Sequence, residues 1–376
     1  MSYGVLLLAG GRTHQENYAP LFAADPRARL IGVADERDIP EDRARWNERL
    51  ARDLGVPVLP DLGAALARPD VHIASIVVEL ERRGRVAVQA ARAGKHLFMD
   101  KPLAASVEDA RAIVAACRES RVRSHMDTMV RTAWASRARE VVASGRLGDL
   151  RSIHCDLLFA KGKAGTATLG RPRREHFPPA HFTFVDSKRE LMTTGVYSLA
   201  LISWLTSRRP RTVWATTSNY FFAEHAGHDV EDFGIIALTL EGGVTATLTA
   251  GRIGWSSDPA GGPNRVLLVG SRASLLIDAY HPRLELYNDE PPWTPPPVNP
   301  GDPMGFWKSG QAEAGVRPKQ TWLVDPLASP VSEAAYFLDC IDQNRESDMS
   351  AARAAEGIEV LMAAYRSAAT GQVIRL

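Results

Sequence analysis

Short apolar segments alternate with amphipathic stretches through the first third of the chain, and this pattern constrains the fold more than any other feature. The apolar segments cover residues 5–9, 29–34, 73–78, 96–99 and 123–126. The stretches between them have helical periodicity and end at Gly55, at Gly94 and near Arg118. Strands that alternate with helices are typical of βαβ units on a parallel sheet. We therefore expect residues 1–124 to form a doubly wound α/β domain of the Rossmann type.

The pattern changes after a helix predicted over residues 133–144. Longer alternating segments follow at residues 150–159, 212–222, 233–240, 244–250, 265–269 and 274–278. Because no helices separate most of them, we expect a large open, mostly antiparallel sheet in a second α/β domain, residues 125–376. Helices over 332–344 and 351–369 are predicted to pack back onto it. The polar segment 161–189 and the proline-rich segment 280–330 are predicted loops.

Composition narrows the functional class. A chain of 376 residues that is 45% hydrophobic and 24% charged has enough apolar material for two domain cores. Its formal net charge of +1 disfavours nucleic acid or a membrane surface as a partner. Cys117, Cys155 and Cys340 are far apart and lack metal-ligand spacing, so we expect neither disulfides nor a metal site. With no leader or membrane-spanning segment recognisable, we expect a cytoplasmic protein.

The strongest motif lies at the end of the fourth apolar segment. The run from Ala93 to Ala104 reads AGKHLFMDKPLA, which places Asp100, Lys101 and Pro102 at the carboxyl end of a predicted parallel strand. Ligands of open parallel sheets bind at that edge, and Pro102 restricts the backbone that presents the charged pair. The run resembles the AGKHV-x-x-EKP motif of the Gfo/Idh/MocA family, with Asp100 in place of the glutamate. The resemblance implies a nicotinamide-dependent dehydrogenase with Lys101 as a catalytic residue.

The cofactor prediction depends on two further segments. The loop after the first strand contains Gly10, Gly11, Arg12 and Thr13, and it keeps one glycine of the dinucleotide fingerprint. Asp35 ends the second strand, where a carboxylate accepts hydrogen bonds from the adenosine ribose and favours NAD over NADP. Arg37, two residues later, leaves NADP open as an alternative.

The family resemblance also assigns cofactor contacts elsewhere. Val78 and Glu79 stand where the family has a Thr-Pro-Asn turn beside the nicotinamide, and Arg83 stands where it has a histidine. Arg131 falls where the family has Asn-x-Arg, and we expect it to contact Asp100 or the cofactor.

In the second domain, the resemblance identifies the segment 191–205 as the helix that faces the nicotinamide. Thr193 replaces the family's aspartate and Tyr197 its histidine. Hydride transfer needs a group that takes up the hydroxyl proton, and an ammonium beside a phenol lowers the phenol's pKa. We therefore predict that Lys101 and Tyr197 are catalytic and that Thr193 and Thr194 orient the substrate.

Basic residues in the segment 161–189 predict an anionic group on the substrate, and a solvated loop face is the alternative explanation. His225 and His228 are predicted substrate contacts. The predicted reaction transfers hydride between NAD(P) and a carbinol or ketone of a sugar, cyclitol or related polyhydroxylated molecule, in a homodimer or homotetramer. Two alternatives remain: bound NAD used for epimerisation, elimination or glycosidic cleavage, and a non-catalytic binding or regulatory protein on the same fold.

Overall fold

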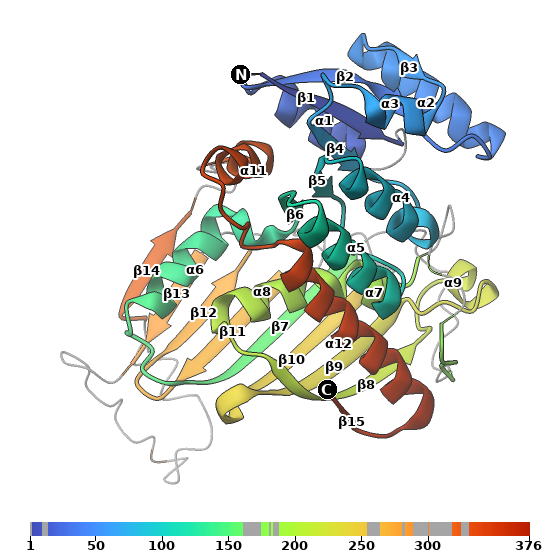
Figure 1. Cartoon of the computed structure of the whole chain (residues 1–376). Helices are drawn as coiled ribbons and strands as arrows, with labels where there is room; N and C mark the ends of the chain where they lie inside the picture. The colour runs from blue at the N-terminus through green and yellow to red at the C-terminus, as the bar shows by residue number, and fades with distance from the viewer. Residues whose placement is uncertain are drawn as a thin grey trace.

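Two α/β units make up the computed structural model of the chain, with the first unit above a broad second sheet in Figure 1. The structure describes residues 2–9, 14–160, 174–179, 182, 188–253, 264–279, 283–288, 300, 318–324 and 331–376. The loop 10–13 and most of the segments 161–187 and 289–317 lie outside the described residues.

The first unit is a six-stranded sheet in the order β3-β2-β1-β4-β5-β6, with every pair of neighbouring strands parallel. Its strands are β1 (Tyr3–Leu8), β2 (Ala28–Ala34), β3 (Val58–Leu59), β4 (Ile73–Ile76), β5 (His96–Met99) and β6 (Ser124–Met126). Its helices are α1 (Gln15–Ala23), α2 (Glu41–Leu54), α3 (Leu62–Ala67), α4 (Leu80–Arg92) and α5 (Val107–Glu119). The strand order reverses between β1 and β4, so the ligand crevice of this fold lies at their carboxyl ends.

Local sequence explains where these helices begin and end. Gly55 adopts a left-handed conformation, with φ of 66°, and ends α2 as predicted. The Ser106 side chain accepts a hydrogen bond from the Asp109 amide and so caps the start of α5. The short β3 and α3 were not predicted, because two residues and six residues are too few to show a clear period.

The second unit is a nine-stranded sheet in the order β14-β13-β12-β11-β7-β10-β9-β8-β15. Only the β7–β10 pair is parallel, so the prediction of a mostly antiparallel sheet is confirmed. Its strands are β7 (Leu150–Ala160), β8 (Pro210–Ser218), β9 (Phe233–Leu240), β10 (Thr245–Ile253), β11 (Asn264–Gly270), β12 (Ser274–Asp278), β13 (Arg283–Tyr287), β14 (Gln320–Leu323) and β15 (Ile374–Arg375).

Two expectations for this unit were wrong in detail. The segment 280–330 was predicted to be a loop, yet it supplies β13 and β14 at one edge of the sheet. The strand predicted over 212–222 ends at Ser218, and the chain then turns into α9 (Ala223–Gly227). Both errors arise because pairing with neighbouring strands, rather than local composition, decides how far a strand extends.

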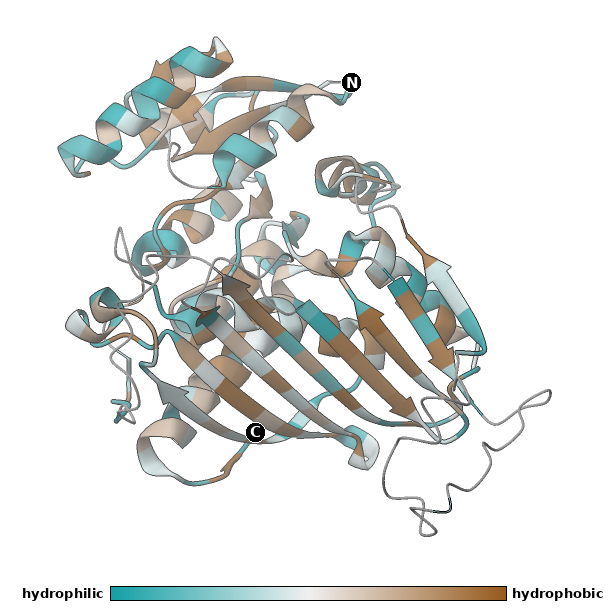
Figure 2. Cartoon of the chain, turned by 180° about the vertical axis from the view of Figure 1, so that it is seen from behind, coloured by the Kyte–Doolittle hydropathy of each residue, from teal (hydrophilic) through white to brown (hydrophobic). Residues whose placement is uncertain are grey.

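Most of the remaining described helical segments cover one face of the large sheet or join the two units (Figure 1), whereas the turn Glu241–Gly243 connects β9 to β10. They are η1 (Met129–Arg131), α6 (Ala133–Ala143), α7 (Glu190–Thr193), α8 (Gly195–Thr206), η2 (Glu241–Gly243), α11 (Glu333–Asp342) and α12 (Ala351–Thr370). Figure 2 shows the opposite face of the sheet, which no helix of the described residues covers. Trp214 of β8 is 41% exposed, and side chains along β9 alternate between buried and partly exposed.

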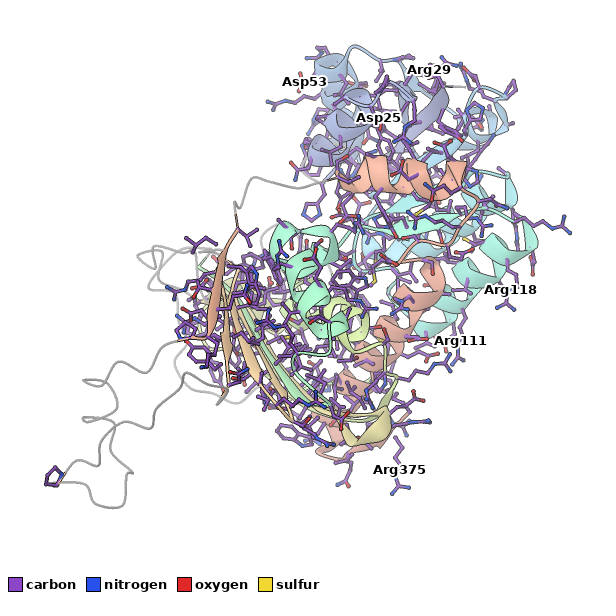
Figure 3. All side chains as sticks on the ribbon, turned by 90° about the vertical axis from the view of Figure 1, so that its left-hand side faces the viewer. Asp25, Arg29, Asp53, Arg111, Arg118 and Arg375 are labelled. Carbon is purple, nitrogen blue, oxygen red and sulfur yellow. The ribbon has the colours of Figure 1, made fainter. Side chains whose placement is uncertain are left out.

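The two C-terminal helices pack back toward the start of the chain. α11 joins the core of the first unit, where the Phe337 ring lies 5.9 Å from the Phe98 ring of β5. α12 crosses both units, because it packs on β8 and α8 and also on α5, where Arg111 pairs with Glu359 at 2.8 Å. Arg111 and Arg118 project outward from α5 in Figure 3. None of the helices in the described ranges is long and apolar enough to cross a membrane.

Candidate active site

Lys101 lies at the carboxyl end of β5 and reaches the second unit. Its Nζ atom donates a hydrogen bond to the Thr193 carbonyl oxygen at 2.6 Å and lies 4.6 Å from the centre of the Tyr197 ring. Burial lowers the pKa of Lys101 to about 8, although the nearby Asp100 charge opposes that shift. The structure therefore brings together the two residues that the sequence predicted to be catalytic, and the ammonium contacts the ring of Tyr197.

The strand end that carries Lys101 is held by Arg83, a residue of α4 that is 4% exposed. Arg83 donates to the Val78 carbonyl at 2.9 and 3.1 Å and to the Asp100 carbonyl at 3.0 Å, and it also donates to the Pro102 carbonyl. One guanidinium thus joins the end of β4 to both residues that flank Lys101. The family resemblance identified Arg83 only as the residue in place of a histidine, and it implied no role for Arg83.

The Asp100 carboxylate is surrounded by donors. His14 Nδ1 lies 2.8 Å from Oδ1, the Tyr18 hydroxyl donates to the same oxygen at 2.9 Å, and Arg83 lies 3.4 Å from Oδ2. Burial alone raises the pKa of Asp100, but the His14 hydrogen bond and the Arg83 charge outweigh burial and hold it well below its usual range. His14 and Tyr18 had no distinguishing sequence signal, because both lie in a segment identified only by its glycines.

A second cluster surrounds Glu190 at the start of α7. Its Oε2 accepts from the Thr194 hydroxyl at 2.9 Å, and its Oε1 lies 2.6 Å from Arg252 Nε and 3.4 Å from His225 Nε2. His225 is 1% exposed, and its Nδ1 has no hydrogen-bond partner within the described residues. The Thr193 hydroxyl donates back to the Arg189 carbonyl at 2.9 Å. The hydroxyl protons of Thr193 and Thr194 are therefore already donated, which leaves their oxygens as acceptors toward a substrate.

The crevice beyond β2 and β4 has an unusual charge arrangement. Asp35 is 8% exposed and accepts from the Glu36 amide at 2.8 Å, from Asn47 at 2.9 Å and from two nitrogens of Arg82. Arg82 also donates to Glu79. Burial raises the pKa of Glu79, but the charges of Arg82 and Arg43 outweigh it and leave that pKa below its usual range. Arg82 thus bridges α4 and the end of β2, where an adenosine ribose binds in this fold.

These residues fit NAD, provided that Arg82 moves away from Asp35. A carboxylate at the end of β2, a crevice at the strand-order reversal and Lys101 beside the second unit provide the three contacts that the dinucleotide needs. The four acceptor positions of Asp35 are already occupied, so ribose hydroxyls reach it only when Arg82 moves. Gln15, at the third fingerprint glycine, is fully buried and bonded to Ser75. The predicted contacts Gly10, Gly11, Arg12 and Thr13 lie outside the described residues.

Three further predicted contacts do not join these clusters in the structure, and their roles toward cofactor or substrate stay predictions. Arg131 was expected to contact Asp100 or the cofactor, but its guanidinium stacks 3.9 Å from the Tyr336 ring and lies 3.6 Å from Asp348, because η1 directs it toward α11. Arg37 is exposed and pairs with Asp61. His228 is exposed at the end of α9, whereas His225 of the same segment faces Glu190.

Comparison with protein families identifies both units of the chain. Residues 4–128 match the model described as the oxidoreductase family with an NAD-binding Rossmann fold, and residues 135–276 match the GFO/IDH/MocA C-terminal domain. The predicted NAD-binding domain and fold class are thereby confirmed.

Individual relatives match this chain over only part of its length or at low sequence identity. The 1,5-anhydro-D-fructose reductase of Ensifer adhaerens is 41% identical over 81 residues, which cover 21% of this chain and 24% of the relative. The levoglucosan dehydrogenase of Pseudarthrobacter phenanthrenivorans is 28% identical over 182 residues, 43% of this chain and 45% of the relative. The chain spans between 24% and 59% of the length of the curated relatives that it matches. The solved structure of the WlbA dehydrogenase from Bordetella pertussis with NADH and UDP-GlcNAcA has a TM-score of 0.74 at 18% identity, covering 100% of this chain and 98% of that one.

Proposed function

The chain belongs to the Gfo/Idh/MocA family of oxidoreductases, and we propose that it transfers hydride between NAD and a carbinol or ketone of a sugar, cyclitol or related polyhydroxylated molecule. The observation that carries this proposal is the placement of Lys101. Its amine lies where the first unit meets the helix segment of the second, against the Thr193 carbonyl and the Tyr197 ring. The reductase and dehydrogenase relatives act on carbohydrate substrates by name, which supports the substrate class.

The bound nicotinamide supplies the hydride acceptor, and the chain's own residues manage the proton. The neutral amine of Lys101 takes the proton from the substrate hydroxyl during oxidation and returns it during reduction. With a pKa of about 8, Lys101 has both protonation states populated near neutral pH, as a general acid–base group requires. The Thr193 carbonyl holds Nζ in place through its hydrogen bond, and Tyr197 provides an aromatic face that stabilises the ammonium form.

An acidic group on the substrate is part of the proposal. Lys188 lies two residues before α7, and within the described residues it forms no ion pair or hydrogen bond. Burial lowers its pKa, and the Arg252 and Arg83 charges add to that shift. Lys101 likewise has no hydrogen-bonded carboxylate among the described residues. Two ammonium groups that form no hydrogen-bonded ion pair with a carboxylate among the described residues favour a carboxylate or phosphate on the substrate.

The bare face of the nine-stranded sheet supports a homodimer or homotetramer. Side chains on that face include Trp214, and none of the helices among the described residues covers it (Figure 2). The three cysteines are free and buried, which supports the cytoplasmic location that we propose.

Titration with NAD and NADP, followed by a screen of sugars, cyclitols and their acids, tests the proposal. The expected result is saturable binding that favours NAD, followed by substrate-dependent appearance of reduced nicotinamide in the near-ultraviolet spectrum. Tight cofactor binding with product formation but no net reduction of NAD favours the epimerisation or elimination alternative. Absence of binding to every nicotinamide form, with none carried over from purification, refutes the dehydrogenase assignment.

A further inference from the structure

A single phenol hydroxyl lies between two carboxyl groups beside the proposed catalytic lysine. The Tyr18 oxygen is 2.9 Å from Asp100 Oδ1 and also 2.9 Å from Asp127 Oδ2. Asp100 directly precedes Lys101, and Asp127 directly follows β6 on the neighbouring strand. The three groups come from α1, from the end of β5 and from the end of β6, so only the folded chain assembles them.

The protons in this arrangement can be counted. A phenol has one proton to donate, and an ionised carboxylate has only acceptor oxygens. Two ionised carboxylates within hydrogen-bond distance of one hydroxyl would leave one contact between lone pairs. A second proton is therefore required, and it must reside on Asp100 or on Asp127.

The surroundings decide which carboxyl group carries that proton. Asp100 has His14 at 2.8 Å and Arg83 at 3.4 Å, and both favour its ionised form. The charged and titratable groups that face Asp127 are Tyr18 from α1, Asp100 and Lys101 from the end of β5, and Glu333 from α11. The negative charge of Glu333, which lies 2.8 Å from His125 Nε2, opposes ionisation of Asp127.

The balance of charges agrees with this count. Burial and the Glu333 charge raise the pKa of Asp127 well above its usual value, whereas that of Asp100 is held low. Burial and the Asp100 charge also raise the pKa of Tyr18, which keeps the phenol protonated.

We propose that Asp127 is a neutral carboxylic acid that donates to Tyr18, and that Tyr18 in turn donates to Asp100 and fixes that carboxylate beside Lys101. Asp127 and Tyr18 are thus positioning residues for Lys101, and this catalytic consequence rests on the proposed function. Loss of the Asp127 proton at alkaline pH leaves two carboxylates competing for one phenol proton. The added negative charge then favours the ammonium form of Lys101 and lowers the fraction of Lys101 that is present as the neutral amine.

Infrared spectroscopy of the intact protein tests the proton directly, without any assay of activity. Wild-type protein labelled with ¹³C in the aspartate carboxyl groups is expected to show a protonated carboxylic-acid band at neutral pH that shifts in D2O. The band should be absent from Asp127→Asn and present in Asp53→Asn, an exposed control on α2. A wild-type spectrum without a protonated aspartic acid overturns the proposal even if no variant folds.

The pH profile tests the positioning role once a substrate is known. In wild type we expect kcat/KM for oxidation to fall again on the alkaline side, and we expect Asp127→Asn to lose that fall because an amide does not ionise. A merely structural role lowers kcat/KM by one factor at every pH, and that result contradicts the positioning role. A protonated Asp127 in a protein that oxidises no polyol or sugar leaves the infrared result standing and removes the proposed function instead.

Discussion

Replacing Arg83 with methionine tests whether one guanidinium holds the catalytic strand end. The substitution removes the donors to the carbonyls of Val78, Asp100 and Pro102, and methionine keeps most of the buried length of the side chain. An unsatisfied buried acceptor costs roughly 1–3 kcal/mol. The substitution leaves three such acceptors, and water that enters the site is expected to satisfy part of them. We therefore expect the free energy of unfolding to fall by about 3–5 kcal/mol.

Urea unfolding followed by circular dichroism measures this loss, with Arg92→Met as the matched control on the same helix. Arg92 is exposed in the last turn of α4, so its substitution is expected to change the free energy of unfolding by less than about 0.5 kcal/mol. The two variants should have equal m-values if only the folded state changes. A loss for Arg83→Met within about 0.5 kcal/mol of the control would falsify the role assigned to this guanidinium.

Four further predictions concern the site and the assembly. Lys101→Met is expected to lower kcat by at least about a hundredfold while the variant still binds NAD in a calorimetric titration, and an unchanged kcat contradicts the general-base role. Because the neutral amine is the base, the rate of oxidation should rise as the pH approaches about 8, before the alkaline fall expected from ionisation of Asp127, and a rate that falls as the pH approaches about 8 excludes Lys101 as the base. Asp35→Ala releases Arg82 beside the ribose position, so NADP affinity should rise by about tenfold relative to NAD, and a fluorescence titration without that change refutes the contact. Trp214→Lys on the bare sheet face is expected to shift the mass measured by light scattering toward the monomer, whereas an unchanged mass places the interface elsewhere.

Residues of the candidate site could be predicted only where the residues next to them in the sequence form a recognisable motif. Lys101 stands next to Pro102 at the end of an apolar strand, and Tyr197 stands in an apolar helix, so short motifs pointed to both. Arg131 was misplaced because η1 turns its side chain toward Tyr336, and no local pattern records that turn. The Asp35 carboxylate was located correctly at the end of β2, but its capture by Arg82 was not foreseen.

The sequence by itself determined the two-domain plan and the parallel order of the first sheet, because apolar periodicity and helix-ending glycines act within a few residues of each other. It also determined that a lysine stands at the carboxyl end of β5. Only the tertiary structure decided which groups surround that lysine. In the sequence, Tyr18 is 82 positions from Asp100 and 109 positions from Asp127. The two aspartates meet because parallel strands place their carboxyl ends at a single edge of the sheet, and α1 brings Tyr18 to that edge. Hydrogen-bond partners and charges at such an edge are set by topology, which a local pattern cannot express.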